Sequence, residues 1–197
     1  MIKNNFTNVL GLILLLPLTN CGGSGSSTAS SGCNPCIIYV SATTSTANLS
    51  GVSGADSICQ NDANKPSSVG TAKALIVDGT NRVACTSANC SGGTSEHTDW
   101  VLQPSVAYTR SDSTYIATTT SAGIFSFNIP NPIYAPATNI WTGLSTDFTT
   151  AGDCTNWTNS AAVVDGEMGE SDLADVSAIQ IGTSFCHLTR ALYCVEQ

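Results

Sequence analysis

Residues 140–144 read Ile-Trp-Thr-Gly-Leu, and together with the cysteines that follow they are the strongest indication of the fold. Ten residues later comes Cys154-Thr-Asn-Trp157, and after a long polar stretch residues 184–196 read Ser-Phe-Cys-His-Leu-Thr-Arg-Ala-Leu-Tyr-Cys-Val-Glu. Aromatic and β-branched residues favour extended structure, so we expect one strand over 139–144 and another over 191–195. The C-terminal part is therefore predicted to hold two strands on either side of a long loop.

Outward from this stretch, few residues are charged, and Thr, Ser, Asn and Gly separate short apolar runs. This composition favours many short strands joined by turns over long helices. Further strands are expected over residues 37–41, 72–77, 100–102, 113–118 and 124–128.

Residues 53–64 predict a short helix. Ser53 followed by Asp56 resembles a capping box, with Asp where Glu or Gln is usual. The apolar residues of one helical face are then Ala55, Ile58, Cys59 and Ala63. Cys59 is thus expected on the buried side, with a disulfide partner in the core sheet.

The N-terminus indicates export. Lys3 precedes a ten-residue apolar run, 9–18, which is too short to span a membrane and is typical of a signal peptide. Leu18-Thr19-Asn20-Cys21 resembles a bacterial lipoprotein box in its looser spirochaetal form, with Cys21 as the lipidated residue, and an ordinary signal peptide is the alternative. Residues 22–32 contain only Gly, Ser, Thr and Ala, the composition of a flexible tether. We expect a signal peptide over 1–20, a lipidated tether over 21–32 and one domain over 33–197.

The order of these motifs resembles the C-type lectin-like fold, in which a Trp-x-Gly-Leu core strand precedes two nested disulfides. The resemblance is closer to endostatin, and it extends over about residues 39–196. With its lipoprotein box, the chain looks like the leptospiral endostatin-like lipoproteins, within a larger Leptospira family that shares a domain of unknown function. The resemblance implies an α+β fold: a mixed, mostly antiparallel twisted sheet, one or two short helices and long loops clasped by disulfides. Its signature core residues are Trp141, Gly143, Leu144 and Trp157.

By the same resemblance Cys59 pairs with Cys194, and Cys154 pairs with Cys186. Sequence alone allows 105 pairings of eight cysteines. Four residues separate Cys85 from Cys90, which suggests a local clasp, and Cys33 with Cys36 is the remaining pair. Cys33-Asn-Pro-Cys36 is also a Cys-x-x-Cys sequence, but redox activity needs a thiolate stabilised by a helix N-terminus or a cation. We therefore interpret it as a structural clasp.

The negative net charge of the chain excludes several classes of binding partner. Without residues 1–20 the chain has five basic and 14 acidic side chains, a net charge of −9, and no two basic residues are adjacent. Nucleic acid and sulfated polysaccharide need a clustered positive surface, so we expect neither nucleic-acid nor heparin binding. Endostatin's zinc-binding histidines and heparin-binding arginines also lack counterparts here.

The sequence gives no sign of catalysis. His97 and His187 are the only histidines, too few for a histidine-rich zinc site, and no nucleophile, base and acid stand out as a set. We expect His187 to be structural, and we expect no enzyme activity and no cofactor. Residues 165–175 carry five carboxylates inside the Cys154–Cys186 loop, where C-type lectins bind calcium and sugar. Their ligand motifs are absent, so a solvated acidic loop is expected, with calcium binding as the alternative.

Two kinds of function fit these features. The resemblance implies a lipid-anchored protein of the outer membrane, exposed at the cell surface, that docks host matrix or complement-regulatory proteins such as laminin, fibronectin, plasminogen and factor H. The alternative is an envelope lipoprotein with a lectin-like or structural role. Binding residues are expected in the variable loops 85–99, 104–120 and 157–184.

Overall fold

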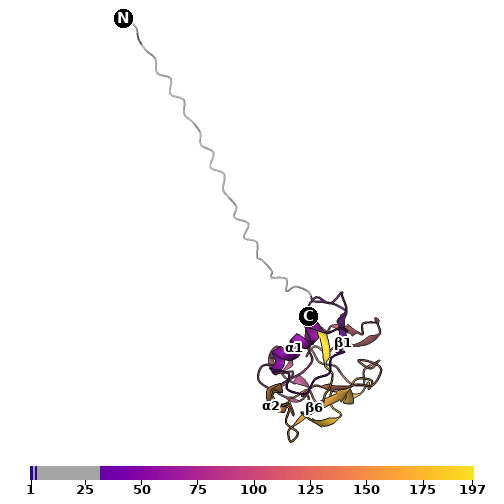
Figure 1. Cartoon of the computed structure of the whole chain (residues 1–197). Helices are drawn as coiled ribbons and strands as arrows, with labels where there is room; N and C mark the ends of the chain where they lie inside the picture. The colour runs from indigo at the N-terminus through magenta and orange to yellow at the C-terminus, as the bar shows by residue number, and fades with distance from the viewer. Residues whose placement is uncertain (2, 4–31) are drawn as a thin grey trace. The chain divides into compact units, whose positions relative to one another are not determined.

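The computed structural model describes residues 1, 3 and 32–197 (Figure 1). The signal peptide, the lipidated Cys21 and the tether as far as residue 31 lie outside the described residues, so they stay predictions. Residues 32–197 belong to one unit with its own core.

The larger sheet has five strands in the order β2-β8-β1-β3-β4. Only β1 and β3 pair in parallel, and the other neighbours are antiparallel. Figure 1 shows β8, in yellow, beside β1. The strands are β1 (Cys36–Val40), β2 (Ala72–Ala74), β3 (Ala107–Thr109), β4 (Tyr115–Thr118) and β8 (Tyr193–Glu196). The chain termini of the domain thus meet in the middle of one sheet.

The smaller sheet is antiparallel, in the order β5-β6-β7. Its strands are β5 (Asn139–Trp141), β6 (Asp165–Glu170) and β7 (Gly182–Phe185). The helical elements are α1 (Gly51–Asn61), α2 (Cys154–Trp157), η1 (Ala88–Cys90), η2 (Gly93–Glu96) and η3 (Val176–Ala178). The predicted α+β class, with mostly antiparallel strands and short helices, is confirmed.

Several predicted strands are shorter or absent. Residues 100–102 and 124–128 form no strand, although Val101, Leu102 and Phe125 are buried. The strand expected over 72–77 ends at Ala74. The Leu75 amide still donates to Tyr193 of β8, but the chain then turns away and the Val77 amide donates to the Thr142 carbonyl instead. Apolar side chains can fill a core from a loop, so residue type alone overestimates extended structure at these places.

Strand β6 was missed because its sequence, Asp-Gly-Glu-Met-Gly-Glu, has low β-propensity. Its glycines are required by close packing. A Cβ on Gly166 would lie 2.7 Å from the Cys154 Sγ, and one on Gly169 would lie 2.1 Å from the Ala178 carbonyl oxygen. The segment 165–170 is therefore a strand between two others, and the prediction of an acidic loop there is wrong.

Helix α1 begins at Gly51 and ends at Asn61, so Ala63 lies outside it. No capping box forms, because Asp56 accepts hydrogen bonds from the Ala74 amide and from Arg82. The buried side of the helix carries Ala55 and Cys59, as predicted.

The two signature tryptophans are fully buried, with ring centroids 5.8 Å apart. The Trp157 Nε1 donates to the Val77 carbonyl at 2.7 Å. Gly143 has a φ of 68°, and a Cβ there would lie 2.5 Å from the same carbonyl oxygen. Leu144 is also buried. The Trp-x-Gly-Leu stretch thus packs at the centre of the domain, and glycine is required by both conformation and space.

Four disulfides form in the predicted pairs, of which the resemblance implied two and the spacing and the remaining cysteines suggested the other two. They are Cys33–Cys36, Cys59–Cys194, Cys85–Cys90 and Cys154–Cys186. The second joins α1 to β8, and the fourth spans the loop between α2 and the end of β7. Cys33–Cys36 lies at the start of β1.

Candidate binding pocket and acidic surface

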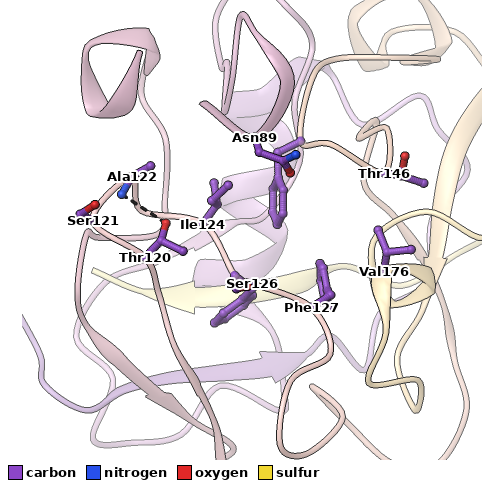
Figure 2. Close-up of a pocket in the computed structure, with 11 residues that line it drawn as sticks. Asn89, Thr120, Ser121, Ala122, Ile124, Ser126, Phe127, Thr146 and Val176 are labelled. Carbon is purple, nitrogen blue, oxygen red and sulfur yellow. Dashed lines mark hydrogen bonds between the residues drawn. The ribbon is translucent and has the colours of Figure 1, made fainter. Parts of the chain in front are cut away.

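A pocket of about 590 Å³ opens where four segments of the chain meet (Figure 2). We call it the phenylalanine pocket. Its lining residues are Asn89, Thr120, Ser121, Ala122, Ile124, Phe125, Ser126, Phe127, Thr146, Phe148 and Val176. Ligand pockets typically enclose roughly 300 to 1,000 Å³. The volume is therefore large enough for a small molecule or for a side chain with adjoining backbone.

The lower wall of the phenylalanine pocket is apolar. Phe125 and Phe148 are buried in the core, and the ring of Phe127 stacks on Phe148 with centroids 5.9 Å apart. Figure 2 shows Ile124, Phe127 and Val176 below Asn89 and Thr146. Because core packing fixes Phe125 and Phe148, this apolar surface is held in place before any ligand arrives.

The rim of the pocket is polar and uncharged. Asn89, Ser121, Ser126 and Thr146 are exposed, and their side chains form no hydrogen bond to any described residue. Among the described residues that line the pocket, none is charged. The rim can therefore donate and accept hydrogen bonds without competing against internal partners.

Asn89 is held at the rim by a short closed loop. The Cys85–Cys90 disulfide closes this loop, and the Asn89 amide donates to the Asp147 carbonyl at 2.8 Å. Glu96 accepts hydrogen bonds from the Ser87 hydroxyl at 2.6 Å and from the Ser87 amide at 2.7 Å. The Ser87 side chain and neighbouring amides lower the pKa of Glu96 to about 2, so its carboxylate is charged at neutral pH. Disulfide and carboxylate together order this side of the pocket.

Two aspartates are next in sequence to residues that line the phenylalanine pocket. Asp147 lies between two lining residues, and Asp175 directly precedes Val176. One Asp147 oxygen accepts hydrogen bonds from the Ser145 and Thr149 hydroxyls at 2.5 and 2.6 Å, which lowers the pKa of Asp147. Asp175 accepts from the Ser177 amide at 2.8 Å. Neither forms an ion pair with a described residue, and each keeps one oxygen without a protein hydrogen bond in the described part of the chain.

The cationic side chains of the domain are all bonded within it. Two of them form ion pairs with aspartates, and three donate to backbone carbonyls. In order they are Lys73 and Arg82, then Lys65, Arg110 and Arg190. Of the 14 carboxylates, only Asp56 and Asp99 have a cationic partner within the described residues. Of the other twelve, Asp62 and Asp78 are buried, and the remaining ten give the domain an excess of negative charge at its surface.

A second, polar pocket of about 370 Å³ lies beside the N-terminus of α1. Its two aspartates, Asp56 and Asp99, are both bonded to Arg82, whose side chain is fully buried. Arg82 also donates to the Ala74 carbonyl at 2.7 Å. These carboxylates thus neutralise a buried cation and hold β2 against α1.

The acidic stretch does not gather into a metal site. In the described part of the chain, no three His, Cys, Asp or Glu side chains lie together as metal ligands. Asp165 pairs across the sheet with Phe185, and Glu167 accepts a hydrogen bond from Gln180 at 3.1 Å. These carboxylates are spread along an extended strand.

The two histidines differ in setting. Both ring nitrogens of His97 lie within hydrogen-bond distance of backbone carbonyls, those of Ala84 and Ala122, so His97 joins two segments that line or support the phenylalanine pocket. His187 is exposed and stacks on Phe185, with centroids 5.9 Å apart and no side-chain hydrogen bond to a described residue. The expectation of a structural role for His187 is not met by its contacts.

The predicted binding loops supply part of the pocket: Asn89, Thr120 and Val176 lie in the three segments named from sequence. The segments 121–127 and 146–148 were missed. Residues 124–128 alternate in a way that favours a strand, and neutral Ser, Thr and Phe residues carry no chemical signature of a site. Two Phe residues flanking Ser126 in a segment rich in serine and threonine are the one signal available.

Comparisons with known proteins place the chain in a family without assigning a function. Residues 42–174, more than half of the chain, match the family model described as "Protein of unknown function (DUF1554)". No curated protein matches the chain. Among the described residues, no helix is long and apolar enough to cross a membrane. The matched region runs from the end of β1 to the residue before Asp175, and the chain therefore belongs to the DUF1554 family.

Proposed function

We propose that this domain is a binding module of the bacterial envelope, held by a lipid on Cys21, that docks basic surfaces of other proteins. The proposal rests on the difference between the surroundings of the basic side chains and those of the carboxylates. All five cations are bonded internally, whereas twelve carboxylates have no cationic partner among the described residues. A surface of one sign steers and selects partners of the other sign.

The finer assignment rests on resemblance. The similarity to leptospiral endostatin-like lipoproteins with a C-type lectin-like fold supports host matrix and complement-regulatory proteins as the partners. The order of Cys59, Trp141, Cys154, Cys186 and Cys194 supports it too, since the structure joins these cysteines as that frame requires. Laminin, fibronectin, plasminogen and factor H are the proteins to test first.

Binding by residues 33–197 tests the proposal. All four disulfides and the core lie within this segment, so it is expected to fold alone. Immobilised laminin, fibronectin, plasminogen and factor H should be titrated with the oxidised domain. We expect saturable binding to at least one of them, and binding to none would refute the host-binding proposal.

Surface exposure is tested separately by protease treatment of intact cells that carry the lipidated protein. The proposal expects loss of the protein before the cells lyse. Complete protection on intact cells, with cleavage after lysis, would place the domain inside the envelope and favour a structural or carbohydrate-binding role there.

A further inference from the structure

We infer that the phenylalanine pocket is the anchor point of this binding surface: it takes one large apolar side chain of a partner protein, and Asp147 and Asp175 bind a lysine or arginine next to that side chain. The inference rests on the proposed function and specifies which part of a basic partner is recognised.

The apolar wall selects the anchor. Phe127 presents its ring at the pocket, and this ring is stacked on Phe148, which is only 1% exposed because the core holds it. Protein interfaces draw most of their affinity from a few aromatic or arginine side chains that enter such pockets. A tryptophan, phenylalanine or leucine of the partner can bury its side chain here without any rearrangement of the core.

The polar rim of the pocket favours a peptide as the ligand. Asn89 and Thr146 are exposed and make no side-chain hydrogen bond to a described residue, so both are free to bond to an incoming group. A peptide backbone offers one donor and one acceptor per residue. The Asn89 side-chain amide and the Thr146 hydroxyl can therefore hydrogen-bond to the peptide backbone on either side of an inserted side chain. A purely apolar ligand would leave these two rim groups without a partner.

The flanking charges select basic neighbours. Asp147 is kept ionised by two hydroxyl donors, and its other oxygen has no hydrogen bond from a described residue. Asp175 is exposed and uses one oxygen to cap η3. No cation lines the pocket among the described residues, and all five basic side chains of the domain are bonded elsewhere. An external lysine or arginine has no internal competitor for these two carboxylates.

Three short peptides test the inference in an NMR titration of the ¹⁵N-labelled oxidised domain, residues 33–197. The probes are blocked Gly-Arg-Trp-Arg-Gly, Gly-Arg-Ala-Arg-Gly and Gly-Glu-Trp-Glu-Gly. We expect the first to shift the backbone amides of residues 124–127 and 146–148. The second and third should each bind at least about ten-fold more weakly, the equivalent of about 1.4 kcal/mol.

Two matched pairs of variants assign the effect to the pocket. Thr146→Trp fills the rim and should abolish the shifts, whereas Thr80→Trp, also at an exposed threonine without a side-chain hydrogen bond to a described residue, should not. Asp175→Asn should weaken binding of the first peptide. Asp112→Asn, at another aspartate that accepts from the amide two residues on, should leave binding unchanged.

The outcomes separate this inference from the proposed function. A domain that binds a matrix or complement protein equally well with Thr146→Trp keeps its proposed function and overturns the inference. Peptide shifts without any protein partner would uphold the pocket and refute the wider function. Equal binding of Gly-Arg-Trp-Arg-Gly and Gly-Glu-Trp-Glu-Gly would show an apolar ligand pocket and overturn the basic-partner part.

Discussion

Arg82 is the residue on which most of the charged contacts of this domain converge. Its guanidinium donates to both Asp56 oxygens at 2.8 Å and to Asp99, while its side chain has no exposed surface. The fork geometry of arginine allows these bonds at the same time, whereas the single ammonium of lysine cannot make them all. Arg82 thus joins α1, β2 and the segment that leads to Trp100.

Arg82→Lys is expected to lower the free energy of unfolding by about 2 to 3 kcal/mol, because one ammonium cannot replace the donors to the buried Ala74 carbonyl and to both oxygens of the partly buried Asp56. Urea denaturation of the oxidised domain measures this. Arg110→Lys is the matched control; Arg110 donates only to the Pro132 carbonyl, and its loss should cost under about 1 kcal/mol. Equal losses of stability in the two variants would show that the Arg82 hydrogen bonds contribute no more than those of Arg110.

Asp62 makes stability depend on pH. Burial disfavours its charged form and acts to raise the pKa, but backbone amides of Ala42, Thr43 and Asn64 donate to the carboxylate at 2.8 to 3.0 Å and the net pKa is lowered. The carboxylate therefore stabilises the fold above its ordinary pKa of about 3.9, and this contribution is lost as pH falls through the lower folded value.

Asp62→Asn should cost about 1 to 2 kcal/mol at neutral pH and should flatten the decline in stability between about pH 5 and pH 1. Thermal unfolding followed across that range measures both effects. Asp165→Asn, at an exposed aspartate of β6, removes the same charge and should change neither. An unchanged pH profile in Asp62→Asn would contradict the role given to these amides.

At the scale of elements, α2 is a turn of left-handed conformation: every residue from Cys154 to Trp157 has a positive φ. Each such non-glycine residue costs roughly 1 to 2 kcal/mol. The Cys154–Cys186 disulfide and the buried Trp157, whose amide donates to the Asp153 carbonyl at 2.7 Å, hold the turn in place. Thr155, exposed and β-branched with a φ of 60°, is the least suited to it.

Thr155→Gly should therefore raise the free energy of unfolding by about 1 kcal/mol, the relief being partly offset by the greater freedom of glycine in the unfolded chain. Thr155→Ala keeps a Cβ and should give no such gain. Denaturant midpoints of the two variants measure the difference. A glycine variant that is less stable than the alanine variant would mean that the turn is not strained at this residue.

The disulfides should differ in their contribution because they close loops of different length. Cys59 and Cys194 are 135 residues apart, whereas Cys85 and Cys90 are five apart. Loop-closure entropy gives about 5 kcal/mol for the long link and about 2 kcal/mol for the short one. Replacing each pair by alanine and comparing urea midpoints tests this order. The reverse order would indicate that the Cys85–Cys90 disulfide stabilises the domain more than the Cys59–Cys194 disulfide does.

Sequence predicts the elements whose pattern is periodic and misses those that depend on neighbours. The buried position of Cys59 followed from helical spacing, and β1 and β5 followed from apolar runs. Strand β6 could not be found, because its glycines reflect contacts with Cys154 and Ala178 that are distant in sequence. The phenylalanine pocket was missed for a similar reason: four separate segments build it, and none carries a titratable signature.

For the whole molecule, charge is the property that connects fold to function. The domain carries 14 carboxylates against five basic side chains, and two of these five are ion-paired with aspartates, so the carboxylates define the outer field. Fields of this kind act over about one Debye length, which is about 10 Å at 0.1 M salt. Docking of a basic partner should therefore weaken with salt, whereas the burial of its apolar side chain in the phenylalanine pocket should not.

The salt dependence of binding tests whether the acidic surface docks basic partners. Residues 33–197 should be titrated onto whichever of laminin, fibronectin, plasminogen and factor H they bind, with NaCl raised from about 0.1 M to about 1 M, where the Debye length falls to about 3 Å. We expect the affinity to fall by at least about ten-fold, mainly through a slower association rate. Binding that is unchanged over this range, or absent for all four proteins at low salt, would contradict the account of an acidic docking module.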